Sequence, residues 1–378
     1  MKIQPFALER YFAKYEFSAP YLLCCSDCEA LSLLELTSMA DVDSLRLWEE
    51  LGLGYTESKG HPLLREEVAR LYHHISPQEV LVTAPEEGIF IAMQNLLQKG
   101  DHIVVTAPGY QSLSEVARSI GCDCSFWMPE WDDATGWRFQ VEELYTLITK
   151  KTKLLVINFP HNPTGAILSE SELNRVVEVA RERNLTIFSD EMYRYLEHEP
   201  ALRLPSVAEI YERGIALSGL SKSFALPGLR IGWLISKDQA LLQSCATYKD
   251  YTTICSSAPS EVLGIMGLRA KEHILQRNHH IISKNLALLD AFFNRHASLF
   301  RWHRPSASSI AFPKFLSDTP ITRYCDALIE KCGVMLLPAP LFGIDGPWFR
   351  IGFGRKNLPE ALSKWESAEI LNSISELI

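Results

Sequence analysis

The chain alternates between short, nearly continuous apolar runs and longer segments in which apolar residues recur every three or four positions. Continuous runs are typical of strands in a sheet that is covered on both faces, and the wider spacing is typical of helices that bury one side. The runs predict strands near residues 80, 103, 123, 155, 187, 215 and 231, most of them separated by helices. This order predicts an α/β fold: a large domain with a mostly parallel seven-stranded sheet flanked by helices, plus a smaller α+β domain.

Several predicted helices have recognisable ends. A helix over 41–50 has an acidic first turn and ends at the glycines of 52–54. A helix over 85–97 has proline at its first position, with Thr83 or Ala84 as the N-cap. The segment 237–295 is largely helical, and we expect one long helix in it to join the large domain to the C-terminal one.

Three regions of the chain are expected from these patterns. Residues 1–40 carry aromatic and apolar side chains without a sustained period, which predicts an N-terminal arm that packs on another part of the molecule as part of the small domain. Residues 41–269 form the expected large domain, and 270–378 the small C-terminal domain with a final helix over 358–377. A length of 378 residues is compatible with one large and one small domain.

The net charge and the lengths of the apolar stretches exclude some classes of protein. The net charge of -9 argues against a general nucleic-acid surface. We find neither an apolar signal core near Met1 nor an uninterrupted apolar stretch of about 18 residues, so we expect a cytoplasmic protein without membrane contact.

The nine cysteines form an odd, scattered set that fits reduced thiols. Cys25, Cys28, Cys122 and Cys124 could make a four-thiolate zinc site. The second pair stands in a predicted strand, where alternate residues face opposite sides, so we favour core packing and expect no metal.

Lys222 stands where an ordinary solvated lysine is hard to explain. Apolar residues 215–217 and 220 precede it, small residues flank it, and a second apolar strand follows. Burial lowers the pKa of an ammonium group and yields the neutral amine that attacks carbonyls to form a Schiff base. Arg230 supplies a planar cation suited to phosphate, so the pair suggests a phosphorylated aldehyde. The alternative is a strand, a turn and a strand whose Lys222 and Arg230 reach solvent.

Other polar residues stand where predicted strands end. Asn162 follows the strand 153–158 in an Asn-Pro-Thr-Gly turn, and Asp190 follows the strand 185–189. A carboxylate at the end of a buried strand is unfavourable unless it meets a cation. Ligands of such sheets bind outside the carboxyl ends of the strands, which predicts one site. The turns expected to meet there are Ala84-Pro85, Pro108 to Tyr110, Asn162, Asp190 to Tyr193 and Lys222.

The segment from Ser221 to Trp233, Ser-Lys-Ser-Phe-Ala-Leu-Pro-Gly-Leu-Arg-Ile-Gly-Trp, resembles the lysine segment of class I/II aminotransferases, which are fold type I pyridoxal phosphate (PLP) enzymes. Other landmarks of that family follow in its order over nearly the whole chain. The resemblance implies a fold type I PLP-transferase with PLP held as an internal aldimine on Lys222. It also implies transfer of an amino group between an amino acid and a 2-oxo acid, and a biosynthetic role in amino acid metabolism.

The resemblance assigns roles around the PLP ring. Lys222, Asp190 and Tyr110 are the catalytic residues it implies. Tyr110 stacks on the pyridine ring, Asp190 pairs with the ring nitrogen, and Asn162 and Tyr193 bind the phenolic oxygen. The alternatives from the residues themselves are a core or capping Tyr110, a pure-turn Asn162 and an N-capping Asp190.

For the phosphate, the resemblance implies the turn Ala84-Pro85-Glu86, Ser221, Arg230 and, from the neighbouring subunit, Tyr55. This assignment predicts a homodimer with shared active sites, whereas Tyr55 could otherwise be a loop aromatic. Two departures stand out. Pro85 removes one backbone donor, so the amides of Ala84, Glu86 and Glu87 must serve, and both glutamates should point sideways. Gly219 replaces a common serine, whose hydroxyl Ser221 or Ser218 can replace.

For the substrate, the resemblance implies Arg350 as the bidentate partner of the α-carboxylate, with Asn162 beside it. Ser26 and Asp27 stand where many relatives carry a substrate-touching glycine, so we expect them at the substrate. Arg355 is either a second anion contact or a solvated charge, and we favour the solvated charge.

One other function fits the pattern, and two more lack a feature that they require. The nearest keeps PLP: a lyase or cyclase acting by β-elimination or replacement, because the arm at Leu8 to Phe12 and the segment after Arg350 also resemble relatives that cyclise hydroxyarginine, such as capreomycidine synthase. A PLP-sensing regulator would carry a basic DNA-binding domain before the fold. A nicotinamide oxidoreductase would need a Gly-x-Gly-x-x-Gly turn, which 82–88 does not supply.

Overall fold

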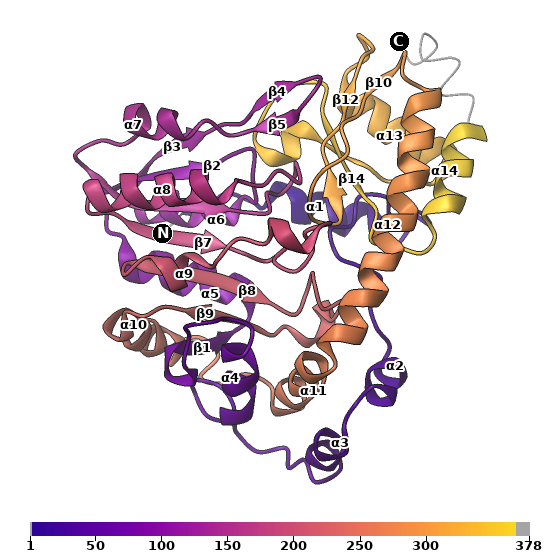
Figure 1. Cartoon of the computed structure of the whole chain (residues 1–378). Coiled ribbons are helices and arrows are strands. Elements are labelled where there is room, and N and C mark those ends of the chain that lie inside the picture. Colours follow the sequence, from indigo (N-terminus) through magenta and orange to yellow (C-terminus); the bar gives the residue numbers. More distant parts are fainter. Residues whose placement is uncertain (1, 368–378) are drawn as a thin grey trace.

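The computed structural model describes residues 2–367 and is built around a twisted sheet (Figure 1). Its seven strands lie in the order β1-β9-β8-β7-β6-β2-β3, and only β9 runs antiparallel to its neighbours. This confirms the seven predicted strands and the α/β fold class. The strands are β1 (Val80–Thr83), β2 (His102–Thr106), β3 (Asp123–Trp127), β6 (Thr152–Asn158), β7 (Thr186–Asp190), β8 (Gly214–Gly219) and β9 (Gly232–Ile235).

Helices cover both faces of this sheet, which explains its continuous apolar runs. In β6, Leu154 and Val156 pack with α5 (Pro85–Leu96) and α6 (Ser112–Ile120). Leu155 and Ile157 pack with α8 (Glu170–Glu182) and α9 (Val207–Ile210) on the other face. Successive side chains of a strand point to opposite faces, so an unbroken apolar sequence is what a doubly covered strand requires.

The predicted helix ends are largely confirmed. Asp41 caps α3 (Val42–Glu49) by accepting a hydrogen bond from the Ser44 amide at 2.9 Å. Ala84 is the N-cap of α5, and Pro85 is its first residue. The predicted long helix is α12, with 25 residues. It spans Lys271–Arg295, and further α-helices within residues 41–270 are α4 (Pro62–Ala69), α7 (Leu144–Leu147), α10 (Gln239–Lys249) and α11 (Ala258–Arg269).

A second hydrophobic core surrounds the buried rings of Phe300, Tyr324 and Trp365, and the C-terminal part of α12 contributes to it. Its elements are β10 (Phe300–Arg301), β11 (Ile310–Ala311), β12 (Lys314–Phe315), α13 (Ile321–Cys332), β13 (Leu337–Pro338), β14 (Phe349–Gly352) and α14 (Leu358–Ser367). The hairpin of β4 (Glu130–Asp132) and β5 (Gly136–Arg138) packs its tryptophans against Trp348 of this part. Residues 368–377 of the predicted final helix lie outside the described residues.

The N-terminal segment packs on this second core, as expected of an arm. Tyr21 forms a bridge with Val334, and the Gly352 amide donates to the carbonyl oxygen of Leu23. This segment also contains two short helices that the sequence did not predict, α1 (Ala7–Tyr15) and α2 (Leu33–Ser38). The division at residues 40 and 269 stays a prediction.

None of the helices within residues 2–367 is both long and apolar enough to cross a membrane. Over the same residues, no three or more His, Cys, Asp or Glu side chains gather where a metal could bind, so the four-thiolate zinc hypothesis is wrong. All nine cysteines are free thiols, and of the pair expected in the core, Cys122 is buried and Cys124 is partly buried against the same core.

Candidate active site

A cavity of about 490 Å³ lies at the carboxyl ends of the sheet strands, between the sheet, the N-terminal segment and β14. It gathers the predicted site residues from separate turns, with the exception of Ala84 and Tyr55. Those that line it are Ser26, Asp27, Pro85, Glu86, Tyr110, Asn162, Asp190, Tyr193, Ser221, Lys222, Arg230 and Arg350. Leu8, Glu9, Phe12 and Glu16 of the α1 region also line it, together with Asn158 and Arg355.

Lys222 lies in the turn that follows β8, and its amine faces the cavity. Its Nζ donates a hydrogen bond to the Ser26 Oγ at 2.9 Å. The turn is held by its neighbour Ser223, whose carbonyl oxygen accepts a hydrogen bond from the side-chain Nδ2 of Asn278 at 2.9 Å. Burial lowers the pKa of the Lys222 amine, with Asp27 opposing that shift and Arg350 reinforcing it. The structure thus places a readily neutralised amine in the cavity.

Asp190 is the last residue of β7, and its side chain is buried. Its Oδ1 accepts a hydrogen bond from the Met192 amide at 3.1 Å, but no helix begins here, so the N-cap alternative is wrong. Burial raises the pKa of the Asp190 carboxyl to about 7, with the Met192 amide opposing the shift and the Glu86 charge reinforcing it. A cation that entered the cavity beside Asp190 would favour its ionised form.

Asn158, which the sequence reasoning missed, connects two predicted residues. It stands opposite Asp190 in the β6–β7 register. Its Nδ2 donates to the carbonyl oxygen of Asp190 at 3.0 Å, and its Oδ1 accepts from the Asn162 amide at 2.8 Å. A signal for this role exists in the sequence, since a polar amide ends an otherwise apolar strand.

Arg350 of β14 is almost completely buried, with 1% of its surface exposed. Its Nε and Nη2 donate to the Cys24 carbonyl oxygen at 3.2 and 2.9 Å, and its Nη1 donates to the Asn162 Oδ1 at 3.1 Å. Within residues 2–367, its guanidinium forms no ion pair with a carboxylate. A buried cation that lacks a counter-ion is suited to bind an anion that enters the cavity.

Gly219 and Pro85, the two residues that depart from the resembled phosphate motif, lie next to each other. A side chain on Gly219 would have its Cβ 2.9 Å from the Gly232 Cα and 3.3 Å from the Pro85 Cγ. A serine at position 219 would therefore clash with β9 and crowd the proline ring. Ser218 donates its hydroxyl to the Glu191 carbonyl oxygen at 3.2 Å, whereas the buried Ser221 Oγ has no partner. Ser221 is thus the better placed of the two hydroxyls.

Two expectations about the phosphate turn need correction. The Ala84 amide donates to the Glu87 Oε2 at 3.3 Å, and Ala84 does not line the cavity, so its N–H is already engaged. Glu87 does point sideways, toward Thr253, but Glu86 lines the cavity instead. Burial raises the pKa of the Glu86 carboxyl, with the Ser112 and Tyr110 hydroxyls opposing the shift.

The arginines at the cavity differ in their partners. Arg230 has a left-handed backbone (φ 56°), is exposed, and donates to the Pro227 carbonyl oxygen at 2.9 Å. Arg355 donates from Nη2 to both carboxylate oxygens of Asp27, at 3.1 and 3.0 Å. Its side chain is only 28% exposed, so the prediction of a solvated charge is wrong. Sequence reasoning missed this ion pair.

Two of the three predicted site tyrosines line the cavity, and the third does not. Tyr193 is buried and lines the cavity, and in the described part of the chain its hydroxyl has no hydrogen-bond partner. Tyr110 also lines the cavity and packs against Phe6 of the N-terminal segment, with ring centroids 5.0 Å apart. Tyr55 is 93% exposed and lies outside the cavity of its own chain, so its role in a neighbouring subunit stays a prediction.

The fold is α/β with a polar cavity at the carboxyl ends of the sheet strands, and comparison with known proteins identifies the family. Residues 49–364 match the model of the family "aminotransferase class I and II", and the chain belongs to this family, whose members are fold type I PLP-dependent enzymes.

The chain is similar in structure to a PLP-dependent aminotransferase from Streptococcus suis, with a TM-score of 0.90, 32% identity and 98% of each chain covered. In sequence it is 26% identical to an aspartate aminotransferase from Pyrococcus horikoshii, over 86% of this chain and 83% of the relative. It is 29% identical to a capreomycidine synthase from Streptomyces vinaceus, over 73% of this chain and 70% of the relative.

Proposed function

We propose that the protein is a PLP-dependent aminotransferase that moves an amino group between an amino acid and a 2-oxo acid. The observation that carries the proposal is the content of one cavity: the desolvated amine of Lys222, the buried carboxyl of Asp190 and the buried guanidinium of Arg350, which lacks a carboxylate partner. The family's chemistry uses an amine, an acid and an anion site of this kind.

The residues present fit PLP. Two buried hydroxyl groups that line the cavity, on Tyr193 and Ser221, have no hydrogen-bond partner among residues 2–367. The phenolic oxygen of PLP would satisfy Tyr193 and lie near Asn162, and its phosphate would satisfy Ser221 and pair with Arg230. The ring nitrogen would supply the cation that Asp190 lacks.

Each side chain then has a separate task. PLP, when bound, supplies the electron sink that stabilises negative charge at the substrate Cα. Arg350 binds the substrate α-carboxylate, and the Asn162 oxygen fixes the orientation of its guanidinium. The Lys222 amine moves the proton at the substrate Cα, because its lowered pKa keeps a neutral fraction available. The two half-reactions share one site, so the kinetics should be ping-pong.

A half-reaction experiment tests the proposal. The enzyme loaded with PLP is mixed with single amino acids in the absence of any 2-oxo acid, and the absorbance is followed. Aminotransfer predicts conversion of the cofactor to its amino form, with one equivalent of 2-oxo acid released per site. Absence of this conversion with every amino acid in a complete panel would refute aminotransfer.

A second candidate function uses the same residues for a different reaction, that of a lyase or cyclase acting by β-elimination or replacement. The similarity to a capreomycidine synthase favours it, as does the cavity wall of Ser26 and Asp27 in place of a glycine. Mass spectrometry of the products separates the two reactions. A cyclised or eliminated product that forms without any 2-oxo acid acceptor would favour the second candidate.

We also propose a homodimer with shared active sites, in the cytoplasm. Exposed apolar side chains support a subunit contact, and they gather in α2, in α3 and in the segments that follow α3 and α10. They are Leu33, Leu34, Val42, Leu53, Tyr55 and Tyr251. Sedimentation equilibrium tests this, and an active monomer would contradict the assignment of Tyr55 to a neighbouring site.

A further inference from the structure

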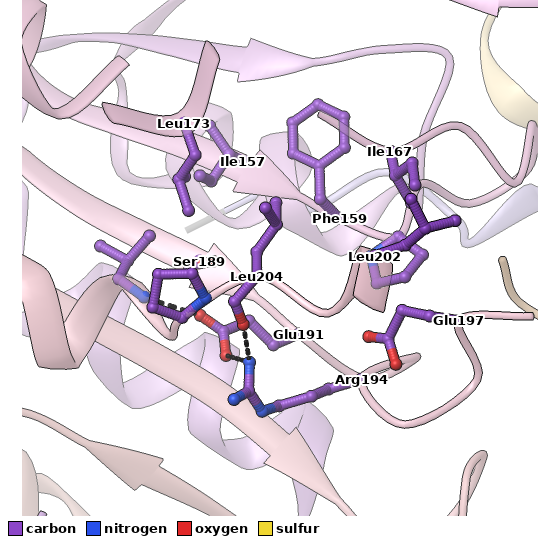
Figure 2. Close-up of a pocket in the computed structure, with 13 residues that line it drawn as sticks. Ile157, Phe159, Ile167, Leu173, Ser189, Glu191, Arg194, Glu197, Leu202 and Leu204 are labelled. Atoms are coloured by element: carbon purple, nitrogen blue, oxygen red, sulfur yellow. Dashed lines mark hydrogen bonds and ion pairs between the residues drawn. The ribbon is translucent and has the colours of Figure 1, made fainter. Parts of the chain in front are cut away.

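The residues on either side of Asp190 face away from the candidate active site. Asp190 lines the large cavity, whereas Ser189 and Glu191 line a small pocket of about 30 Å³. Figure 2 shows Glu191, Arg194 and Glu197 at this pocket, below the apolar side chains of β6 and α8. Since neighbouring residues of an extended segment point in opposite directions, the end of β7 presents Asp190 to one side and Glu191 to the other.

Glu191 is fixed through both its side chain and its backbone. Its Oε1 accepts hydrogen bonds from the Ser206 hydroxyl at 2.9 Å and from the Val207 amide at 3.0 Å. Its own amide donates to the Leu217 carbonyl oxygen at 2.8 Å, and its carbonyl oxygen accepts from the Ser218 hydroxyl at 3.2 Å. The backbone of Glu191 is therefore anchored to β8, the strand that leads to Lys222, and its carboxylate is anchored to the start of α9.

Arg194 is enclosed between two carboxylates. Its Nη1 lies 4.0 Å from the Glu191 Oε2, and its Nη2 lies 4.0 Å from the Glu209 Oε2. Nη1 also donates to the Leu204 carbonyl oxygen at 2.6 Å, and the guanidinium lies 5.4 Å from the ring centre of Tyr72. The Arg194 side chain is 9% exposed, so these contacts hold it in one orientation.

The backbone of Arg194 touches the turn that carries the lysine. The Ser223 hydroxyl donates to the Arg194 carbonyl oxygen at 2.5 Å and to the Met192 carbonyl oxygen at 3.4 Å. Ser223 directly follows Lys222, and Met192 directly precedes Tyr193. The two turns that supply Asp190, Tyr193 and Lys222 thus meet at one hydroxyl group.

We propose that Arg194 is a positioning residue. Its guanidinium, which donates to the Leu204 carbonyl oxygen and lies between Glu191 and Glu209, fixes the backbone of residues 190–195 and, through Ser223, the turn of Lys222. The proposal rests on the function proposed above, because its consequence is a constant separation between the Lys222 amine and the Asp190 carboxyl within a PLP site.

Arg194→Met tests the proposal, with Arg181→Met as the matched control. Arg181 also pairs with a glutamate, Glu212, at 2.9 Å and also lies over a tyrosine, but it is half exposed and remote from the cavity. Hydrogen exchange of the protein without PLP is measured by mass spectrometry. We expect Arg194→Met to raise exchange about fivefold or more in both 190–196 and 220–226, and Arg181→Met to raise it in neither. This readout does not depend on the reaction, so it separates failure of the proposal from failure of the proposed function.

With PLP bound, we expect Arg194→Met to lower kcat of the amino-donor half-reaction about tenfold or more, while KM for the donor changes little. Faster exchange confined to the segment of Arg194, or unchanged kcat in a folded variant, would overturn the proposal and leave Arg194 with a structural role. Ser223→Ala removes only the link between the turns. Should Arg194→Met fail to fold, faster exchange in 220–226 of Ser223→Ala supports the proposal, and unchanged exchange there overturns it.

Discussion

The ring of Pro85 packs against Gly219, so that a Cβ on Gly219 would lie 3.3 Å from the proline Cγ and 2.9 Å from the Gly232 Cα of the next strand. Pro85 and Gly219 depart from the motif that the chain otherwise resembles, and the structure places them in contact. We expect Gly219→Ser to lower the free energy of unfolding by about 1–3 kcal/mol, because an added side chain overpacks this site. Urea denaturation measures the loss.

Only part of that loss should be coupled to the proline, since the backbone of β9 is the closer obstacle. In a double-mutant cycle with Pro85→Ala, we expect a coupling energy of about 0.5–1 kcal/mol. Strict additivity of the two changes would show that Pro85 and Gly219 act independently.

The buried carboxyl of Asp190 should make the stability of the PLP-free protein depend on pH. Its pKa rises from the usual 3.8 to about 7 in the folded protein, chiefly through burial. A folded state with the higher pKa binds the proton more tightly, so its stability falls as the pH rises between these two values. Relative to Asp190→Asn, the wild type should lose about 2 kcal/mol of unfolding free energy between pH 5 and 7. Equal pH profiles for the two proteins would contradict the shift.

Arg350 should matter for the amino donor and little for the cofactor. Its guanidinium is buried and held by Cys24 and Asn162. We expect Arg350→Lys, which keeps the charge but loses the planar fork, to raise KM for the donor about 30-fold or more. The affinity for PLP should change less than about threefold. A larger change in the affinity for PLP than in KM for the donor would show that Arg350 binds the cofactor and not the substrate carboxylate.

The ion pair between Asp27 and Arg355 should determine how well the enzyme accepts a substrate that carries a second carboxylate in its side chain. Asp27 binds the Arg355 Nη2 through both of its oxygens, so the guanidinium is already neutralised. Asp27→Asn releases that charge into the cavity. We expect the ratio of kcat/KM for glutamate over norvaline to rise about threefold or more in this variant. An unchanged ratio would show that Arg355 does not face the substrate side chain.

The parts of the fold and site that follow from local pattern were predictable. The apolar runs predicted the seven sheet strands because both faces of the sheet are covered. The residues Asn162, Asp190 and Lys222 were found because a polar group at the end of a buried strand is unusual. In α1, Leu8, Tyr11, Phe12 and Tyr15 do recur at helical spacing, but the helix spans only nine residues, and its aromatic neighbours obscure the period.

Contacts between distant segments were not predictable from one sequence. Asp27 and Arg355 are 328 positions apart, and nothing local to either residue indicates the pairing. The side chain of Glu86 shares a helix N-terminus with that of Glu87, yet only Glu86 lines the cavity, because Glu87 bonds to Thr253 beyond α10. Tertiary contacts decide these orientations, and only the folded chain shows them.

The most direct test of the account is the site at which PLP attaches. The protein is incubated with PLP, reduced with borohydride, digested and mapped by mass spectrometry. Lys249 is the internal control, because burial also lowers the pKa of its amine, but its Nζ donates to the Ser58 carbonyl oxygen at 2.6 Å and lies outside the cavity. We predict one phosphopyridoxyl group per chain, on Lys222, and none after Lys222→Ala. Labelling of Lys249, or no labelled lysine, would contradict the account.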